Sequence, residues 1–284
     1  MTDDKTLYQQ LLEKKFEIPK DTVFKEHTFR YICTRLTTRN ETTIMQTIHR
    51  LIIPSAEIEA HRGHTGFKHL IDSIKESWNH SNSLDGPARL PTRKVLRYRL
   101  PNPQPDYAVG FKEHAFDSNQ IQKLQAYVGE LNDTSFFKGT SNMFFPFFTA
   151  EEKARTGSLE ATDKANAHSS AIAVRGVIEL FKTVKRENEL PWKILAFSIS
   201  HNYKSVSIYA HYPAVIGEKV TYYRHTIDEF SFTFCHAMYN IWVPFQFKLL
   251  FSAIDDLPDI NFDALPSLPS DSSRPSPAFE SVSS

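Results

Sequence analysis

Apolar residues recur with a helical period in two segments of the N-terminal third of the chain. Residues 39–53 have Asn40 where a helix N-cap is expected. Their periodic apolar positions are Ile44, Ile48, Leu51 and Ile52. Residues 65–78 repeat the spacing, with Phe67, Leu70, Ile71, Ile74 and Trp78. The pattern therefore predicts an amphipathic helix in each segment.

The rest of the chain alternates between short apolar runs and longer amphipathic segments. Strands are predicted over 106–111, 144–153, 193–202, 205–212 and 219–232. Helices are predicted over 118–131, with a serine cap, and over 159–187 and 235–254. This order of elements predicts an α/β (α+β) fold with a mixed central sheet flanked by helices. The aromatic run at 144–148 is expected to be core.

Three parts of different character divide the chain. Residues 1–28 are expected to form a helical N-terminal arm, and residues 29–263 a single domain. Residues 264–284 are rich in serine and proline, a composition that cannot bury enough apolar surface to fold, so a disordered tail is predicted.

The bulk composition excludes several classes of protein. Of the 284 residues, 40% are hydrophobic, which is enough for a sizeable core, and Lys plus Arg balance Asp plus Glu at 33 each. The chain-wide basic excess of many nucleic-acid binders is absent, although residues 30–99 are locally basic and residues 228–284 locally acidic. The two cysteines, Cys33 and Cys235, lack the spacing of a disulfide scaffold or a zinc ribbon.

Targeting and nucleotide-binding patterns are also missing from the sequence. The charged N-terminus lacks the apolar region of a signal peptide, and no uninterrupted apolar run reaches about 18 residues. We therefore expect an intracellular protein, in the nucleus or the cytoplasm, that is not secreted and has no membrane partner. Neither glycine-rich phosphate motif occurs, so no nucleotide cofactor is expected.

The predicted strand 144–153 ends in three charged residues. Because side chains alternate along a strand, Glu151 and Lys153 point the same way, about 7 Å apart, and Glu152 points the opposite way. Asp106 opens another predicted strand. If the two strands are neighbours, Asp106 and Glu151 could share one Mg²⁺ or Mn²⁺ ion, because hard cations prefer carboxylate oxygens. The plainer alternatives are a strand leaving the core and a cap at the start of a strand.

These residues resemble the motif of the PD-(D/E)xK nucleases. Pro105-Asp106 is followed 45 residues later by Glu151-Glu152-Lys153, each on a predicted strand that precedes a predicted helix. The chain is also similar, from about residue 39 to about residue 263, to a family of uncharacterised fungal proteins assigned to that fold. The similar segments include "PQPDYAVGFKEHAF", "FFPFFTAEEKA" and "ILAFSISHNYKSVSIYAHYP". The resemblance implies a PD-(D/E)xK nuclease-like core.

The resemblance also implies roles for single residues. Asp106 and Glu151 would be metal ligands, and Lys153 would be the catalytic lysine. Nucleases of this class often carry a further carboxylate on the helix before the first core strand, and Glu41 would be that ligand. Its alternative role is a first-turn glutamate that complements the helix dipole. The chain departs from the pattern at two positions. Glu152 stands where relatives have valine, and Ala165 stands where relatives have glutamine.

Basic residues near the motif are candidates for binding phosphate groups. The first group, shortly before Asp106, consists of Arg93, Lys94, Arg97 and Arg99. The second is a stripe of Lys164, His168 and Arg175 on the predicted helix 159–187. The alternatives are a solvated loop for the first group and an ordinary helix surface for the second.

Together these features predict a metal-dependent nuclease acting on DNA or RNA, whose departures from the motif are compatible with a degenerate site. The alternatives are a non-catalytic module that keeps the fold and binds nucleic acid or protein, and a decayed remnant with neither role. The other histidines carry no functional prediction. His61 and His64 lack a third zinc ligand nearby, and His201, His211 and His225 are spread over predicted strands.

Overall fold

The computed structural model describes residues 41–44, 49–84, 100–130, 133–153, 159–202, 205–216, 219–229 and 253–257, with isolated positions at 31, 35, 39, 47, 250 and 251. The predicted arm 1–28, the predicted tail 264–284 and most of the predicted helix 235–254 lie outside these residues.

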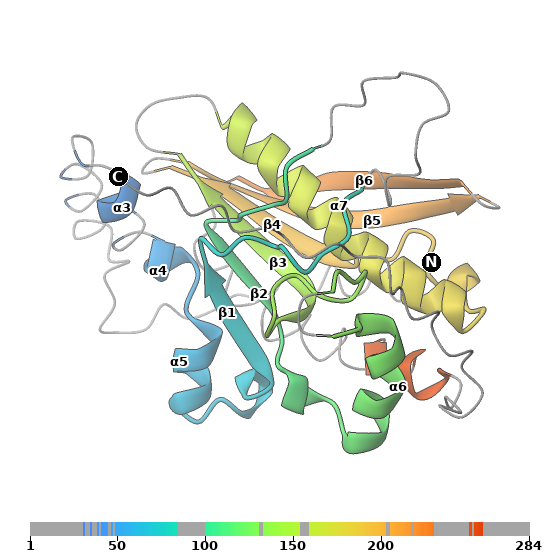
Figure 1. Cartoon of the computed structure of the whole chain (residues 1–284). Helices are drawn as coiled ribbons and strands as arrows, with labels where there is room; N and C mark the ends of the chain where they lie inside the picture. The colour runs from blue at the N-terminus through green and yellow to red at the C-terminus, as the bar shows by residue number, and fades with distance from the viewer. Residues whose placement is uncertain are drawn as a thin grey trace, which may run out of the picture.

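Six strands of the described residues form one mixed sheet, in which β1 to β6 follow one another in sequence order (Figure 1). The strands are β1 Leu70–Ile74, β2 Tyr107–Phe111, β3 Phe144–Glu152, β4 Ala196–His201, β5 Val206–Ile216 and β6 Lys219–Asp228. The α-helices are α3 Glu41–Ile44, α4 Arg50–Ile52, α5 Ala56–His61, α6 Ser118–Val128 and α7 Glu160–Thr183. Short 3-10 helices are η2 Thr65–Phe67, η3 Glu113–Ala115 and η4 Glu187–Glu189.

Neighbouring strands are antiparallel except for β3 and β4, which are parallel. A parallel pair cannot be joined by a tight turn, so the chain returns along the sheet between them in the 24-residue helix α7. Figure 1 shows α7 lying across one face of the sheet. The predicted mixed sheet flanked by helices is confirmed.

Residues of β3 divide between the two faces of the sheet. Thr149 Oγ1 donates to Asn166 Oδ1 of α7 at 2.8 Å, so Thr149 faces α7. Ala150 pairs with Tyr107 of β2 and points the other way. The Tyr107 ring packs edge-on against His49, with 4.9 Å between centroids. Since His49 directly precedes α4, the N-terminal helical segment covers the face opposite α7.

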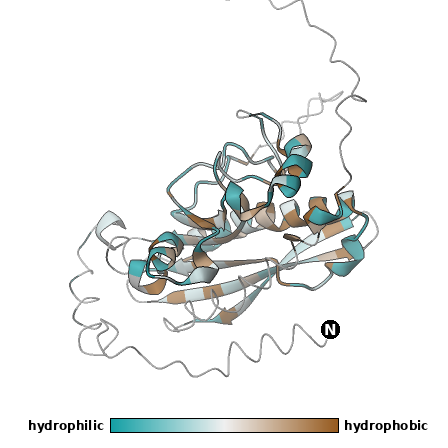
Figure 2. Ribbon diagram, turned by 90° about the horizontal axis from the view of Figure 1, so that it is seen from below, coloured by the Kyte–Doolittle hydropathy of each residue, from teal (hydrophilic) through white to brown (hydrophobic). Residues whose placement is uncertain are grey.

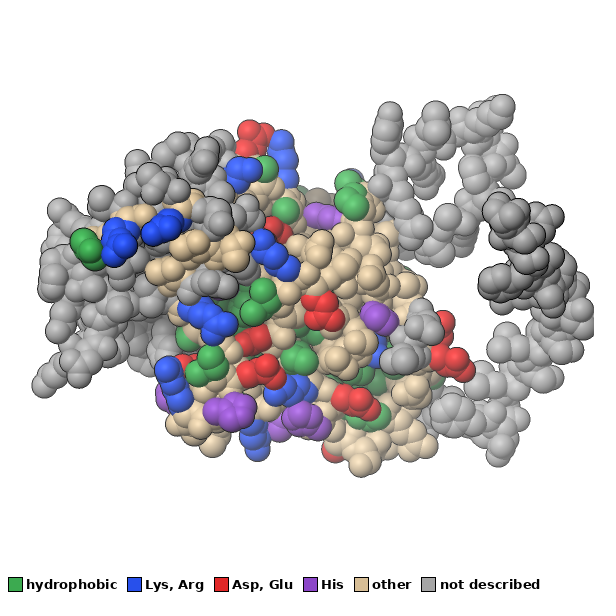
Figure 3. Space-filling view, turned by 60° about the vertical axis from the view of Figure 1, so that its left-hand side comes forward, with side chains coloured by type: hydrophobic (Ala, Val, Ile, Leu, Met, Phe, Trp, Pro, Cys, Tyr) green, Lys and Arg blue, Asp and Glu red, His purple; other side chains and the backbone are tan. Residues whose placement is uncertain are grey.

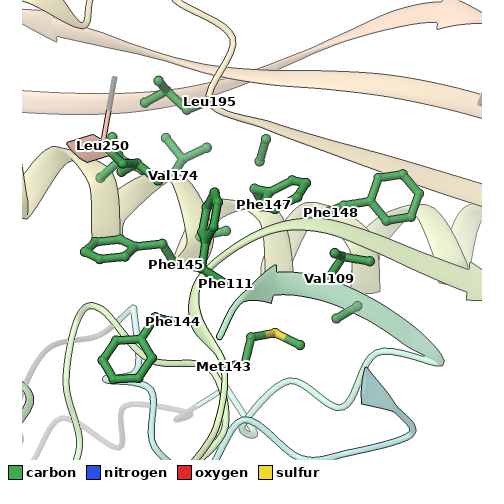
Figure 4. Close-up of a cluster of buried hydrophobic side chains, with 14 of the residues drawn as sticks. Val109, Phe111, Met143, Phe144, Phe145, Phe147, Phe148, Val174, Leu195 and Leu250 are labelled. Atoms are coloured by element: carbon green, nitrogen blue, oxygen red, sulfur yellow. The ribbon is translucent and has the colours of Figure 1, made fainter. Parts of the chain in front are cut away.

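Aromatic side chains fill the core around β3. The run that opens the strand is buried, with Phe144, Phe145, Phe147 and Phe148 each at most 4% exposed. Figure 4 shows these rings gathered with Val174 of α7 and with Leu195 and Leu250. Apolar residues concentrate in the strands and on α7, and hydrophilic residues in the outer helices and loops (Figure 2). The prediction that this run is core is confirmed.

A bulge accommodates the proline inside this run. The register between β2 and β3 shifts between Val109 and Phe111, opposite the stretch that contains Pro146. Proline has no N–H to donate to a neighbouring strand, and bulges are where sheets tolerate it. Beyond the bulge the pairing is regular from Phe148 to Ala150, so the register at the charged end of β3 is well defined.

Two predictions based on periodicity need correction. Residues 65–78 do not form a helix, because the segment contains η2 and then β1, which pairs along the whole of β2. Hydrogen bonds to a neighbouring strand outweighed a local helical spacing that includes two β-branched isoleucines. The cap of α6 is Asp117 and not a serine, with Gln120 completing a capping box. The predicted helix 39–53 contains α3 and α4 among its described residues.

The pairing of β4 with β5 buries a histidine between these strands. His211 is 4% exposed, and its Nε2 lies 2.8 Å from Ser198 Oγ. Burial, and then the positive charge of Arg224, lower the pKa of His211 to about 3. The folded state therefore holds this imidazole in its neutral form.

We expect the free energy of unfolding to decrease as the pH falls from 6.5 toward 3. In that range the unfolded chain protonates this histidine and the folded chain does not, which favours unfolding by about 1.4 kcal/mol per pH unit. His211→Gln removes the titrating group and keeps a polar partner for Ser198. Urea unfolding between neutral pH and about pH 4 should show a shallower acid dependence for His211→Gln than for the wild type. Equal slopes in the wild type and in His211→Gln would contradict the prediction.

Candidate functional site

The ends of β2 and β3 bring the two predicted carboxylates to opposed positions. Tyr107, the first residue of β2, pairs with Ala150 of β3. Continuing the same register by one position would place Asp106 across from Glu151, and directly opposed residues in antiparallel strands have Cβ atoms about 5 Å apart. Glu151 also pairs with Ser200 of β4, whose hydroxyl accepts a hydrogen bond from α7 at 3.0 Å. Glu151 therefore lies on the α7 face of the sheet.

Asp106 links the ends of three strands. Its Oδ2 accepts a hydrogen bond from the main-chain N–H of Glu152 at 2.8 Å, and its Oδ1 lies 3.3 Å from Nζ of Lys75. Lys75, the residue after β1, also donates its main-chain N–H to the Asp106 carbonyl at 3.1 Å. The side chain of Asp106 is 12% exposed. Because each carboxylate oxygen has two lone pairs, both can accept a cation in addition to these partners.

Lys153 directly follows β3. Its main-chain N–H donates to the carbonyl of His201 at 2.9 Å, which extends the β3–β4 pairing by one residue. Glu151 and Lys153 are both half-buried, and residues two apart on an extended chain project to the same side. The structure thus has one acidic residue at the end of each of two neighbouring strands and a lysine two positions beyond the second.

The other predicted site residues have different environments. Glu41 is the first residue of α3, and its side chain lies outside what the structure describes. The first basic group, Arg93, Lys94, Arg97 and Arg99, lies outside the described residues. Lys164 is exposed on α7 and pairs with Glu160, one turn away, at 2.6 Å.

Arg175 has a structural role that the sequence did not predict. It is 7% exposed, and its guanidinium donates to the main-chain carbonyl of Ser83 at 2.6 Å and to that of Asn82. The guanidinium carbon also lies 4.9 Å from the centre of the Phe136 ring. These contacts fasten α7 to the loop after β1. The guanidinium is used inside the fold, so we withdraw Arg175 from the residues expected to bind phosphate.

A second group of ionisable side chains lies on the opposite face of the sheet, and the sequence did not predict it. Glu152 and His201 occupy paired positions on β3 and β4, and His49 reaches them from the N-terminal helical segment. One potential ligand atom from each of the three side chains lies within 4.8 Å of the others. Glu152 is 4% exposed, His201 0% and His49 3%. Glu152, the charged residue that strand alternation directs toward the core, therefore lies beside the imidazole rings of His49 and His201.

The two rings of this group are hydrogen-bonded to each other. His49 Nδ1 and His201 Nε2 are 3.0 Å apart, so one nitrogen carries the proton and the other accepts it. Burial, helped by the charges of His201 and Arg50, lowers the pKa of His49 well below 6.5. Burial also lowers the pKa of His201 to about 4, against a hydrogen bond with the main chain of Asn202. Neutral imidazole is the form that binds metal ions.

A pocket of about 270 Å³ opens beside His49. Its wall includes the Asp72 carboxylate, which accepts hydrogen bonds from Ser55 Oγ, from Tyr107 Oη at 2.8 Å and from the Ala56 main chain at 3.1 Å. Burial raises the pKa of Asp72, and these hydrogen bonds act in the opposite direction. The pocket is small and partly polar, and one of its walls belongs to the buried His–Glu–His group.

Two members of this group, Glu152 and His201, can be related to patterns in the sequence. Strand alternation singles out Glu152 as a charge that faces the core, and His201 lies near the end of the predicted strand 193–202. No spacing motif links them to His49, because the three residues come from three separate segments. Their convergence depends on the parallel register of β3 and β4 and on where the N-terminal segment packs.

The described surface on the β1 and α5 side carries mixed charges. Figure 3 shows acidic, basic and histidine side chains interspersed there, without a continuous basic area among the residues it colours. None of the helices within the described ranges is both long enough and apolar enough to cross a bilayer.

Comparison with known proteins identifies a family but no activity. The family described as a domain of unknown function, DUF7924, matches residues 28–254. No similar curated protein and no similar solved structure is found. The family description names neither a nuclease core nor an origin, so the PD-(D/E)xK assignment and the fungal resemblance stay predictions. The match spans most of the predicted single domain, and the chain therefore belongs to the DUF7924 family.

Proposed function

We propose that this protein is a metal-dependent phosphodiesterase of the PD-(D/E)xK type that cleaves DNA or RNA. The observation that supports the proposal is the register of β2 and β3, whose last pair, Tyr107 with Ala150, directly precedes Asp106 on one strand and Glu151 on the other. Asp106 and Glu151, 45 positions apart in the chain, thus come to the ends of two neighbouring strands, with Lys153 two residues further on. Carboxylates on neighbouring strands are the oxygen donors that Mg²⁺ and Mn²⁺ prefer.

The connections around the motif support the same proposal. The strand after Asp106 leads into α6, and the strand with Glu151 leads into α7, as the resemblance to the nucleases implies. The parallel pairing of β3 with β4 also keeps the main chain at Glu151, Glu152 and Lys153 extended. An extended backbone directs Glu151 and Lys153 to the same side, which the chemistry requires.

The residues would divide the work of phosphodiester hydrolysis in the following way. A bound metal ion would polarise the scissile phosphate and lower the pKa of a coordinated water. Asp106 and Glu151 would hold that ion. Lys153 would orient the attacking water or stabilise the negative charge that grows on the phosphate. Lys75 would offset part of the charge of Asp106.

A specific observation favours the non-catalytic alternative. Asp106 already has two structural partners, the Glu152 main chain and the Lys75 ammonium, and through them it joins β1, β2 and β3. An aspartate whose role is only to join strand ends would make the same contacts. If Asp106 has that role alone, the fold would bind nucleic acid or protein without catalysing a reaction.

We expect Mg²⁺- or Mn²⁺-dependent cleavage of supercoiled plasmid, single-stranded DNA or single-stranded RNA. Asp106→Asn, Glu151→Gln and Lys153→Met should each lower the rate by about 100-fold or more, because each removes a charge that acts on the metal or the transition state. Asn and Gln keep hydrogen-bonding capacity, so the fold should be retained. The control Lys219→Met changes an exposed lysine at the start of β6 and should cleave at the wild-type rate. Cleavage by Glu151→Gln and Lys153→Met at the wild-type rate would refute the mechanism, and metal-independent binding without cleavage would favour the alternative.

We also expect Lys75→Met to tighten the binding of Mg²⁺. The ammonium group of Lys75, 44% exposed, lies 3.3 Å from Asp106 Oδ1 and competes with a second cation for the same carboxylate. For a pair exposed to this extent the effect should be about two- to fivefold in the dissociation constant. Titration calorimetry with Mg²⁺ measures it without depending on catalysis. The matched control is Lys68→Met, which removes an exposed lysine of the same region. Unchanged or weaker binding in Lys75→Met would show that the two cations do not compete.

A further inference from the structure

The His–Glu–His group is a second centre, separate from the Asp106–Glu151 motif. Glu152 and Glu151 are adjacent, so strand alternation directs their side chains to opposite faces of the sheet. Glu152 and His201, which are paired across β3 and β4, lie on the face that the N-terminal segment covers. His49 completes the group from that segment. The group therefore lies across the sheet from the α7 face.

Burying the ionisable side chains of His49, Glu152 and His201 costs free energy unless other groups or an ion stabilise them. An ionised carboxylate inside a protein needs strong partners, because its removal from water is unfavourable. The hydrogen bond between the rings uses one nitrogen of each. The second nitrogen of His201 is accounted for by the hydrogen bond with the main chain of Asn202. His49 Nε2 is buried and has no hydrogen-bond partner among the described residues.

We propose that His49, Glu152 and His201 bind a divalent transition-metal ion of the zinc type. Two imidazoles and one carboxylate suit Zn²⁺ and its first-row neighbours, whereas Mg²⁺ prefers oxygen ligands only. This site differs in ligand chemistry from the carboxylate pair at Asp106 and Glu151, and its existence does not depend on the proposed nuclease activity.

The distances fit such an ion. His49 Nδ1 and His201 Nε2 are 3.0 Å apart, and two ligands of a tetrahedral zinc ion are roughly 3.4 Å apart, so a small separation of the rings would admit the ion. One ligand atom from each of the three residues lies within 4.8 Å of the others, which is close to the spacing that a shared ion requires. The ion would replace the hydrogen bond between the rings and would neutralise the buried carboxylate.

The pocket beside His49 provides an entry path. Of the three proposed ligands, His49 lines this pocket of about 270 Å³, together with the Tyr107 ring that packs against it. Three protein ligands leave at least one coordination position for water or for a small ligand. A metal site needs such a path, since the other two ligands are buried between the sheet and the N-terminal segment.

Cobalt(II) is the probe for this site, because it replaces zinc and absorbs visible light when bound. With excess Mg²⁺ present to occupy the Asp106–Glu151 pair, full-length protein freed of transition metals should bind one Co²⁺ with a visible absorption band, and Zn²⁺ should displace it. Glu152→Gln keeps the shape of the side chain and removes the charge, and it should weaken Co²⁺ binding by about 100-fold or more. Glu160→Gln removes an exposed carboxylate of α7 and should bind Co²⁺ like the wild type. His61→Ala with His64→Ala removes two exposed histidines and should also leave binding unchanged.

Two further measurements keep the proposal falsifiable if Glu152→Gln does not fold. Zn²⁺ should raise the melting temperature of the wild type in proportion to its occupancy, because only the folded state has the assembled site. X-ray absorption of the zinc-loaded wild type should show two imidazole ligands. Absence of both effects in the wild type would overturn the proposal. Equal Co²⁺ binding by the wild type and by a folded Glu152→Gln variant would overturn it too.

Discussion

The hydrogen bond from the Glu152 main chain to the Asp106 carboxylate joins the ends of β2 and β3, and both candidate centres depend on it. It lies directly beyond Tyr107 and Ala150, the last pair of the regular β2–β3 ladder, and holds the two strands together there. Strand alternation then sends Glu151 and Glu152 to opposite faces. A shift of one residue in this register would exchange them, placing Glu151 in the core and Glu152 beside α7.

Along β3 the environment changes from apolar to polar. The first half of the strand carries buried phenylalanines, whereas Thr149 in the second half contacts a polar layer beneath α7. In that layer Asn166 donates to the Ile199 carbonyl at 2.9 Å and to Ser200 at 3.0 Å. Buried polar groups that are hydrogen-bonded in this way fix a single arrangement, because any other leaves them unsatisfied. The aromatic half holds the strand in the core, and the polar half sets the position of its charged end.

The two proposals concern different chemistry on one scaffold. Membership of the DUF7924 family gives the chain a family without an activity, and a fold by itself does not determine a reaction. Phosphodiester hydrolysis is inferred from Asp106 and Glu151 at the ends of neighbouring strands, and transition-metal binding from the buried His49, Glu152 and His201. Glu152 links them, since its main chain holds Asp106 and its side chain belongs to the buried group.

The sequence alone determined the strands around the motif, the helix α7, the aromatic core and the exceptional position of Glu152, because each follows from local periodicity or alternation. It was wrong about residues 65–78, where pairing with β2 overrides a helical spacing, and about Arg175, whose burial depends on a distant loop. The opposition of Asp106 and Glu151 required the β2–β3 register, which a bulge at Pro146 sets. The His–Glu–His group required the parallel β3–β4 pairing and the packing of the N-terminal segment. Contacts between distant segments depend on which surfaces bury each other, and no local pattern encodes that choice.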